Sequence, residues 1–197
     1  MSKSDAMLQI RDELINLKNS PLYAYRNENK YFPVVGEGNL DAHIMFIGEA
    51  PGETEAKTAR PFCGRSGKML DELLASIGLD RQSVYITNLV KDRPEDNRDP
   101  EPSEIALYAP FLDKQIDIIQ PRVIGLLGRH SMKYIFEKFG LADKLQPISK
   151  MHGQSFTVEA SYGPITVIAF YHPAAALYNG SMKPVLIDDF KILKKYK

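Results

Sequence analysis

Three short apolar runs of the sequence each bring a polar side chain that can take part in chemistry. Glu49 comes directly after the run 43–48, Asn88 lies near the end of the run 84–90, and His172 follows the run 165–170. A carboxylate can hold a water molecule, an amide can read the donors and acceptors of a ligand, and an imidazole can donate to a reacting atom. The three side chains are therefore candidates for one functional site.

Apolar periodicity predicts the elements that must position these side chains. Four apolar runs have the pattern of buried strands, and the segments between them repeat apolar residues at helical spacing. This alternation predicts an α/β fold, a three-layer αβα sandwich with a central, mostly parallel four-stranded sheet. The predicted strands span 43–48, 84–90, 123–127 and 165–170, and the predicted helices span 5–18, 66–77, 103–120, 129–139 and 184–196.

The remaining segments complete the predicted organisation. Residues 19–39 and 91–102 are rich in proline, glycine or charge, which predicts irregular loops. Residues 154–159 are expected to pair with the last strand through a turn at 162–164. We expect residues 1–197 to form a single domain, because the length suits one hydrophobic core.

The predicted sheet brings Glu49, Asn88 and His172 to one edge, because ligands bind outside the carboxyl ends of parallel strands. Each residue also has a structural role open to it. Glu49 would be favourable near the positive end of a helix, Asn88 could cap its strand, and His172 could be a turn residue before Pro173. The structural role is the simpler interpretation for each residue alone, whereas the convergence of all three favours a functional site.

Composition and charge narrow the class of protein. Of 197 residues, 44% are hydrophobic, and 25 basic residues balance 25 acidic ones. Any contact with nucleic acid must therefore come from local patches. The single cysteine, Cys63, excludes an intramolecular disulfide and an all-cysteine metal cage, and we expect it to serve packing. The first residues lack the pattern of a signal peptide, and no apolar run reaches the length of a membrane span, so we expect a soluble, cytoplasmic protein.

Four blocks of the sequence carry a specific resemblance. They are Gly48-Glu-Ala-Pro-Gly-Glu-Thr-Glu55, Arg60-Pro-Phe-Cys-Gly-Arg-Ser-Gly67, Tyr85-Ile-Thr-Asn-Leu-Val-Lys91 and His172-Pro-Ala-Ala175. In this order they resemble the motifs of the family 4 uracil-DNA glycosylases, and the resemblance extends from about Leu17 to the C-terminus. Family 5 resembles the chain less, because its first motif usually lacks an acidic residue at the position of Glu49. Relatives that trap DNA covalently carry a basic, histidine-containing insert, which is missing near Lys91.

The resemblance implies hydrolysis of the bond between uracil and deoxyribose in DNA, which releases uracil and leaves an abasic site. The nucleotide must first flip out of the duplex into a pocket. Two catalytic residues are implied: Glu49 would hold the attacking water and oppose the positive sugar, and His172 would donate to O2 of the departing uracil. The other three histidines, His43, His130 and His152, are expected to be structural or solvent-facing. The implied substrate is uracil-containing DNA, single- or double-stranded, bound by a monomer.

The base needs a stacking partner, a reader of its polar edge and a wall beside C5. Phe62 matches the stacking position, although it could be an ordinary core phenylalanine. Asn88 can accept from N3–H and donate to O4, a pair that cytosine reverses. Glu55 matches the position beside C5, where it would exclude the thymine methyl group, although it could be a surface helix residue. The implied uracil-binding residues are Glu49, Ala50, Pro51, Glu55, Phe62, Asn88 and His172, with backbone N–H groups of the loop 49–51 assisting.

Local basic and apolar residues supply the candidate contacts with DNA. The segment 57–68 holds four basic side chains and no acidic one, a pattern typical of a phosphate-contacting patch. Beyond the last motif, Leu177 or Tyr178 could fill the gap left by the flipped base, with a helix cap as the alternative. The predicted DNA contacts are Lys57, Arg60, Arg65, Lys68, Leu177 and Tyr178.

The sequence departs from the family at a cofactor. Most family 4 members bind a [4Fe–4S] cluster through four cysteines. Aligned on the neighbouring motif residues, those positions here hold Leu17, Ser20, Asp92 and Tyr108. We therefore expect no cluster, an altered anchoring of the loops and unaltered chemistry. We also expect no other metal, because the sequence shows no His, Asp or Glu grouping with metal-ligand spacing.

Two other functions stay open at this point. The chain could be a glycosylase of related specificity, acting on hypoxanthine or xanthine, or a non-catalytic DNA-binding or polymerase-associated relative. A protein that only binds DNA does not need Glu49, Asn88 and His172 together, which favours an enzyme.

Overall fold

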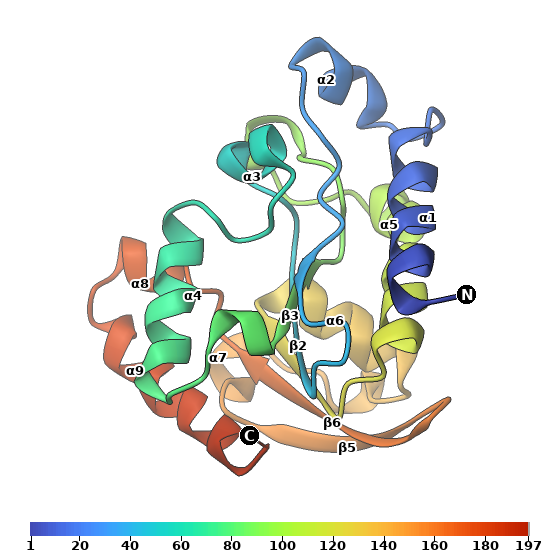
Figure 1. The fold of residues 1–197 in the computed structure, drawn as a ribbon. Helices are drawn as coiled ribbons and strands as arrows, with labels where there is room; N and C mark the ends of the chain where they lie inside the picture. Colours follow the sequence, from blue (N-terminus) through green and yellow to red (C-terminus); the bar gives the residue numbers. More distant parts are fainter. Residues whose placement is uncertain (197) are drawn as a thin grey trace.

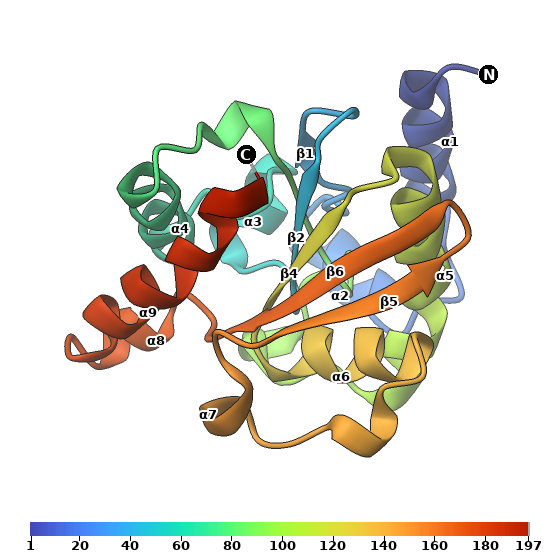
Figure 2. The ribbon, with the colours of Figure 1, turned by 90° about the horizontal axis from the view of Figure 1, so that it is seen from below.

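The computed structural model describes residues 1–196 and has a six-stranded sheet at its centre (Figure 1 and Figure 2). The strands span Glu37–Gly38 (β1), Ile44–Gly48 (β2), Tyr85–Asn88 (β3), Val123–Leu127 (β4), Ser155–Ala160 (β5) and Gly163–Phe170 (β6). Their order in the sheet is β1-β3-β2-β4-β6-β5. β3, β2, β4 and β6 run parallel, whereas β1 and β5 pair antiparallel at the two edges.

Helices cover both faces of this sheet. They span Lys3–Ile15 (α1), Tyr23–Glu28 (α2), Glu53–Thr58 (α3), Arg65–Ser76 (α4), Pro102–Ile119 (α5), Arg129–Lys138 (α6), Ile148–Met151 (α7), Ala175–Tyr178 (α8) and Met182–Phe190 (α9). Apolar residues of α1, α5 and α6 pack on one face, and those of α4, α8 and α9 pack on the other (Figure 2). Short 3₁₀ turns lie at 81–83, 95–97, 142–144 and 191–196.

Burial on both faces explains the continuous apolar pattern of the central strands. In β2, Met45 and Ile47 belong to the apolar cluster under α1 and α5, while Ile44 and Phe46 belong to the cluster under α4 and α9. Parallel strands buried in this way need apolar side chains at every position rather than at every second one. Each such side chain contributes roughly 1.5–3 kcal/mol when fully buried.

The structure confirms most predicted elements and corrects two predictions. The sheet has six strands, so the prediction of a four-stranded sheet is wrong: β1 and β5 extend it at the edges. The pairing of β5 with β6 is confirmed. The segment 19–39 is not wholly irregular, because it contains α2 and β1. β1 has two residues and no apolar pattern, and α2 has six residues, so neither is long enough to show periodicity.

The loops that leave the parallel strands are joined at the carboxyl edge. The backbone N–H of Leu89 donates to the carbonyl of Gly48, and that of Val90 donates to the carbonyl of Glu49. These two bonds continue the pairing of β2 with β3 by one step into the loops. Glu49 and Asn88 are thus held side by side. No helix within residues 1–196 is both long and apolar enough to cross a membrane.

Candidate active site

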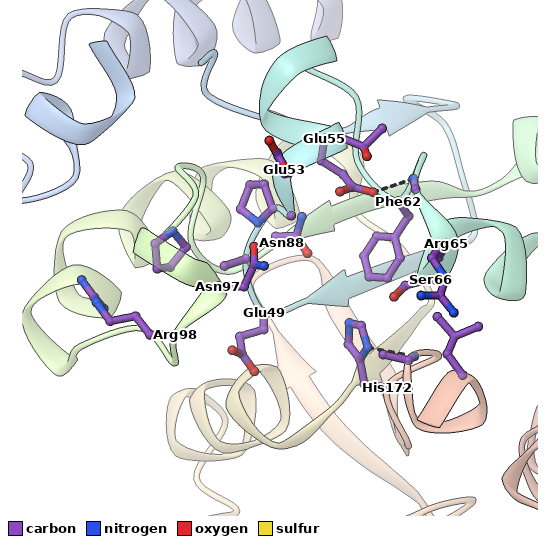
Figure 3. Close-up of a pocket in the computed structure, with 18 of the residues that line it drawn as sticks. Glu49, Glu53, Glu55, Phe62, Arg65, Ser66, Asn88, Asn97, Arg98 and His172 are labelled. Carbon is purple, nitrogen blue, oxygen red and sulfur yellow. Dashed lines mark hydrogen bonds between the residues drawn. The ribbon is translucent and has the colours of Figure 1, made fainter. Parts of the chain in front are cut away.

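A cavity of about 470 Å³ opens at the carboxyl edge of the sheet. Figure 3 shows that the side chains of Asn88, Phe62 and His172 lie around one space, with Glu49 on its far side from Phe62. All four predicted residues therefore come together, from the ends of β2, β3 and β6 and from the turn before α4. The wall also includes Ala50, Pro51, Glu55, Arg65, Leu177 and Tyr178.

Asn88 carries an unpaired oxygen into this region. The residue is 1% exposed, and its Oδ1 is the one buried side-chain nitrogen or oxygen within residues 1–196 that has no hydrogen-bond partner. Such an atom destabilises the free protein by about 1–3 kcal/mol. Asn88 ends β3 opposite Gly48, and a Cβ built on Gly48 would lie 2.3 Å from Oδ1. The absence of a side chain at Gly48 therefore leaves room for the amide oxygen of Asn88.

Phe62 lies in a backbone turn that a glycine makes possible. Its φ is +47°, in the left-handed region. A Cβ on Gly67 would lie 1.8 Å from the carbonyl oxygen of Phe62, so only glycine fits there. The Phe62 ring packs against the core and lies 5.6 Å from the ring of His172, centroid to centroid. The phenylalanine is thus a core residue whose ring also forms a wall of the cavity.

Glu55 supports the same turn from α3. Its Oε1 accepts hydrogen bonds from the backbone N–H groups of Cys63 (2.9 Å) and Gly64 (2.7 Å). The residue is 9% exposed, so the alternative of a surface helix residue is wrong. Two backbone donors fix the carboxylate at the cavity wall beside Phe62 (Figure 3). Cys63 itself contacts Thr58 and the carbonyl of Arg60, which agrees with a packing role.

His172 is held as a neutral donor. Its Nδ1 accepts from the backbone N–H of Ala174 at 3.1 Å, which leaves the ring proton on Nε2. Burial lowers the pKa of His172 to about 4, although the charge of Glu55 acts in the opposite direction. At neutral pH the imidazole is therefore uncharged.

Glu49 has neighbours that the sequence did not indicate. His130 Nε2 lies 3.7 Å from the Glu49 carboxylate and 3.6 Å from that of Asp99, two neighbours that the expectation of a structural or solvent-facing histidine did not include. Burial raises the pKa of Glu49; His130 and Arg129 lower it, and Asp99 raises it. His43 is exposed, and His152 pairs with Asp189, as expected of structural or solvent-facing histidines.

The same cluster has the spacing of a metal site. Ligand atoms of Glu49, Asp99 and His130 lie within 4.8 Å of one another, a grouping that their separation in the sequence concealed. Arg129 donates from Nε to His130 Nε2 at 3.1 Å and forms an ion pair with Asp99. The guanidinium therefore already provides a positive charge to this group and occupies the lone pair of His130.

The four basic residues of the predicted DNA patch differ in their pairing. Lys57 pairs with Glu53, and Arg60 pairs through two bonds with Glu37. Within residues 1–196, Arg65 and Lys68 form no ion pair with a carboxylate. The prediction counted acidic residues only inside the segment, whereas Glu37 and Glu53 come from outside it. Arg65 stands at the first turn of α4, whose N-terminus lines the cavity.

The two candidate wedge residues also differ. Tyr178 is 91% exposed, whereas Leu177 is partly buried against the cluster under α4 and α9. Both line the cavity at its rim. Of the two, Tyr178 is thus the side chain that projects from the surface of the protein.

The loop between β3 and α5 contributes cavity residues that the sequence analysis missed. Pro94, Asn97 and Arg98 line the cavity. Figure 3 shows Asn97 and Arg98 on the side opposite Phe62. Their position in the chain could have indicated this role, because the loop 91–102 follows a strand that ends at the carboxyl edge of the sheet. Its polar composition resembled that of an ordinary surface loop and concealed this role.

The positions that hold cluster cysteines in the family do not fit a cluster here. Ser20 Oγ lies 2.6 Å from the Tyr108 hydroxyl, which donates to Asp92 at 2.6 Å. Three of the four positions are thus linked through the Tyr108 hydroxyl, and the fourth is Leu17, which offers no ligand atom. The chain has a single cysteine, at position 63. No catalytic step is therefore assigned to an iron–sulfur cluster.

Comparison with known proteins identifies the family. Residues 35–191 match the model of the uracil DNA glycosylase superfamily. The chain is 46% identical over 192 residues to the type-4 uracil-DNA glycosylase of Sulfurisphaera tokodaii. These residues make up 97% of this chain and 84% of the relative. It is 46% identical over 187 residues to that of Saccharolobus solfataricus (94% and 84% covered) and 44% identical over 167 residues to that of Archaeoglobus fulgidus (85% and 82% covered). The chain therefore belongs to the uracil-DNA glycosylase superfamily, within its type-4 branch.

Proposed function

We propose that the protein is a DNA-repair glycosylase that hydrolyses the N-glycosidic bond of deoxyuridine in DNA, and that Glu49, Asn88 and His172 carry the reaction. The observation that carries the proposal is the unpaired Asn88 Oδ1, which lies in the same cavity as a neutral His172. Both groups lack something that uracil supplies: Oδ1 needs a donor, and Nε2–H needs an acceptor.

Recognition follows from matching donors and acceptors. A flipped uracil stacks on Phe62, and its N3–H donates to Asn88 Oδ1 while O4 accepts from the amide Nδ2. Cytosine presents an acceptor at N3 and a donor at C4, so both contacts fail. Formation of the missing hydrogen bond at Oδ1 removes the cost of an unpaired buried atom, which makes binding selective for a base with N3–H.

Glu55 is proposed to reject thymine. Two backbone N–H groups hold its carboxylate, so the side chain cannot swing away from an incoming methyl group. A fixed charged wall beside C5 excludes a methyl group both by volume and by the desolvation of the carboxylate. Support for this role comes from the burial of Glu55 and its place in the cavity wall.

The chemistry divides between His172 and Glu49. As the C1′–N1 bond breaks, its electron pair goes to N1 of uracil, and the negative charge spreads to O2, where His172 Nε2–H donates. The deoxyribose becomes oxocarbenium-like, and the Glu49 carboxylate opposes this positive charge. Glu49 also holds the water whose oxygen forms the new bond to C1′, and it accepts the proton that the water loses. Uracil leaves as the anion and takes a proton from solvent.

DNA is proposed to contact the rim of the cavity. The N-terminus of α4, together with Arg65, can bind a phosphate next to the flipped nucleotide, because the first N–H groups of a helix have no partner within it and its dipole is positive there, although the N–H of the N-cap residue Gly64 is already bonded to Glu55. Lys68 adds a second cation on the same helix, and Tyr178 fills the gap left in the base stack. We further propose that residues 1–197 act as a single domain and a monomer, on single- or double-stranded DNA, in the cytoplasm.

A single-turnover assay tests the proposal. Oligonucleotides that contain uracil, thymine, hypoxanthine or xanthine at one position are incubated with excess protein, and the released base is measured. We expect release from the uracil substrate, and its loss in Glu49→Gln, Asn88→Ala and His172→Ala. Release of hypoxanthine or xanthine alone would instead identify a glycosylase of related specificity. Binding of DNA without release of any base would identify a non-catalytic relative.

A further inference from the structure

Four buried polar side chains from distant parts of the chain form one hydrogen-bonded network. The Tyr108 hydroxyl donates to Asp92 Oδ2 at 2.6 Å and lies 2.6 Å from Ser20 Oγ. Arg26 Nη1 donates to both carboxylate oxygens of Asp92, at 2.9 and 3.2 Å. None of these groups is part of the cavity wall, so the network lies outside the proposed active site.

The network also ties down the end of α1. The guanidinium of Arg26 donates to the carbonyl of Leu14 at 2.9 Å and to that of Ile15 at 2.7 Å. These are among the last carbonyls of α1, and that of Leu14 also accepts from the backbone N–H of Leu17. Ser20 Oγ accepts from the backbone N–H of Leu22, in the turn that leads to α2. One set of contacts thus joins α1, α2, the loop after β3, and α5.

All four side chains are buried, so their polar atoms depend on one another for hydrogen bonds. Ser20, Arg26, Asp92 and Tyr108 are 6%, 4%, 0% and 0% exposed. Burial raises the pKa of Asp92, while Tyr108 and Arg26 lower it, so the carboxylate depends on these two partners. A buried ion pair contributes little net stability, yet removal of one partner leaves an uncompensated charge. The main effect of the network is therefore to fix one arrangement of the joined segments, and its net contribution to stability is small.

The segment that Asp92 fixes is the cavity loop. The loop 93–101 begins at the next residue and brings Pro94, Asn97 and Arg98 to the cavity wall. Its far end is held by the ion pair of Arg98 with Glu104 on α5. The loop thus has one buried anchor at each end. The anchor at Asp92 reaches across to α1 and α2, and the neighbouring Arg93 adds a bond to the Tyr25 hydroxyl of α2.

We propose that this network replaces the family's iron–sulfur cluster as the anchor of the loop 93–101, and that Asp92 is a positioning residue for the DNA substrate. Ser20, Asp92 and Tyr108 occupy three of the four cluster-cysteine positions, and Leu17, the fourth, packs against the apolar core. Hydrogen bonds and one ion pair then hold the segments that metal–thiolate bonds would otherwise hold. The inference rests on the proposed uracil excision only for its activity measurement.

The substitution Asp92→Asn tests the anchor, because it keeps the shape and removes the charge that Arg26 needs. We expect the melting temperature to fall by about 6–20 °C. Well below that midpoint, hydrogen exchange at the amides of 95–99 should accelerate, and KM for uracil-containing DNA should rise about tenfold or more. Asp41→Asn is the control, because it makes the same change in the exposed ion pair of Asp41 with Lys3 and should leave all three values near wild type.

Two further variants keep the test decisive if Asp92→Asn does not fold. Tyr108→Phe removes one bond to Asp92 and keeps the ring, and Ser20→Ala leaves the bond between Tyr108 and Asp92 intact. We expect the effects on loop exchange and KM to decrease in the order Asp92→Asn, Tyr108→Phe, Ser20→Ala. A lower melting temperature with wild-type loop exchange and wild-type KM would overturn the positioning role. If the wild-type protein released no uracil, the proposed function would fail, while loop exchange would still decide whether the network anchors the loop.

Discussion

The side-chain oxygen of Asn88 faces the bare Cα of Gly48, and any side chain at Gly48 would displace it. A Cβ at this position would lie 2.3 Å from Asn88 Oδ1 and 2.6 Å from Phe62 Cζ. One glycine therefore sets the distance between the residue proposed to read the base and the residue proposed to stack on it. Its φ is unremarkable, so the need for glycine comes from space and not from backbone conformation.

The substitution Gly48→Ala should abolish most uracil excision without unfolding the protein. The added methyl group pushes Asn88 and Phe62 apart, and a displacement of about 1 Å at a site of chemistry can reduce the rate about 10²-fold. The single-turnover rate on a uracil oligonucleotide measures this effect. Gly180→Ala is the control, because no atom lies within 4 Å of the Cβ it adds. Equal rates for both variants would show that Gly48 does not set the pocket.

The neutral state of His172 predicts a specific dependence on pH. Because burial lowers its pKa to about 4, the imidazole is uncharged throughout the range from pH 6 to 8, and its protonation should contribute no slope to the rate there. The substitution His172→Ala should slow excision by about 10²–10³-fold, the usual effect of losing one donor to a developing anion. The same slowing should appear at pH 6 and pH 8, which single-turnover measurements at the two values will check.

The stability of the protein should respond to His172 with a definite sign. The folded pKa, about 4, lies below the ordinary value of 6.5, so the unfolded chain binds a proton that the folded chain excludes. Stability attributable to His172 is therefore present above pH 6.5 and is lost as the pH falls towards 4. Urea unfolding at pH 7 and pH 5 should show a smaller loss of stability in His172→Ala than in the wild type.

The sequence predicted most of the elements and brought Glu49, Asn88 and His172 to one edge of the sheet, for a physical reason. Buried parallel strands and amphipathic helices impose long apolar patterns, and residues that follow such strands must meet at the carboxyl edge. Glu49, Asn88 and His172 follow from this rule, and Phe62 came from the resemblance to a family. β1 and α2 were missed because very short elements have no measurable period.

Contacts between distant segments were beyond sequence patterns. Nothing in the spacing of Asp99 and His130 indicates that both lie near Glu49, because the contact depends on how the loop after β3 folds over α6. The pairing of Arg60 with Glu37 was hidden for the same reason. Sequence patterns show which residues face the core, whereas side-chain partners across loops depend on the complete fold.

Arg129 is predicted to help keep Glu49 ionised. Burial raises the pKa of Glu49, whereas the positive charge of Arg129 lowers it. In Arg129→Gln, the pKa of Glu49 should rise, so the acidic limb of the pH–rate profile should move to higher pH. The rate well above that limb should change little, because the carboxylate is then ionised in both proteins. Arg11→Gln, at an exposed arginine that pairs with Asp12, should leave the profile unchanged, and an unmoved limb in Arg129→Gln would remove Arg129 from this role.

Removal of metals should leave the activity intact. The purified protein should be colourless, without the broad visible absorbance of an iron–sulfur cluster, because Leu17, Ser20, Asp92 and Tyr108 provide no thiolate. Excision should also persist in EDTA, because Arg129 already pairs with the group formed by Glu49, Asp99 and His130. Iron with acid-labile sulfide in stoichiometric amounts, or a rate that falls in EDTA and returns with a divalent metal, would contradict this prediction.

Asn88 should decide which base is removed. In the proposed complex its carbonyl oxygen would face uracil N3–H and its NH₂ group would face O4, whereas with cytosine each group would meet a like group. Such a mismatch costs about 1–3 kcal/mol for each unsatisfied group. An aspartate at this position could accept from the cytosine amino group, provided that a proton lies between its other oxygen and N3. We therefore expect Asn88→Asp to lose much of its uracil activity and to gain slow, measurable excision of cytosine opposite a mismatched base.

The substitution Asn88→Ala tests whether Asn88 recognises the base by hydrogen bonds or only occupies space in the cavity wall. Alanine provides neither the acceptor nor the donor, and it also removes the unpaired oxygen, so the free protein should be as stable as the wild type or more so. Uracil excision should nevertheless fall by roughly 10–10³-fold, because contacts with the departing base that are worth about 1–4 kcal/mol are lost. No excision of cytosine should appear. Single-turnover rates on matched uracil and cytosine oligonucleotides, together with urea unfolding, measure both effects. Excision of uracil by Asn88→Ala at the wild-type rate would show that another group reads the base and that the pocket must be assigned differently.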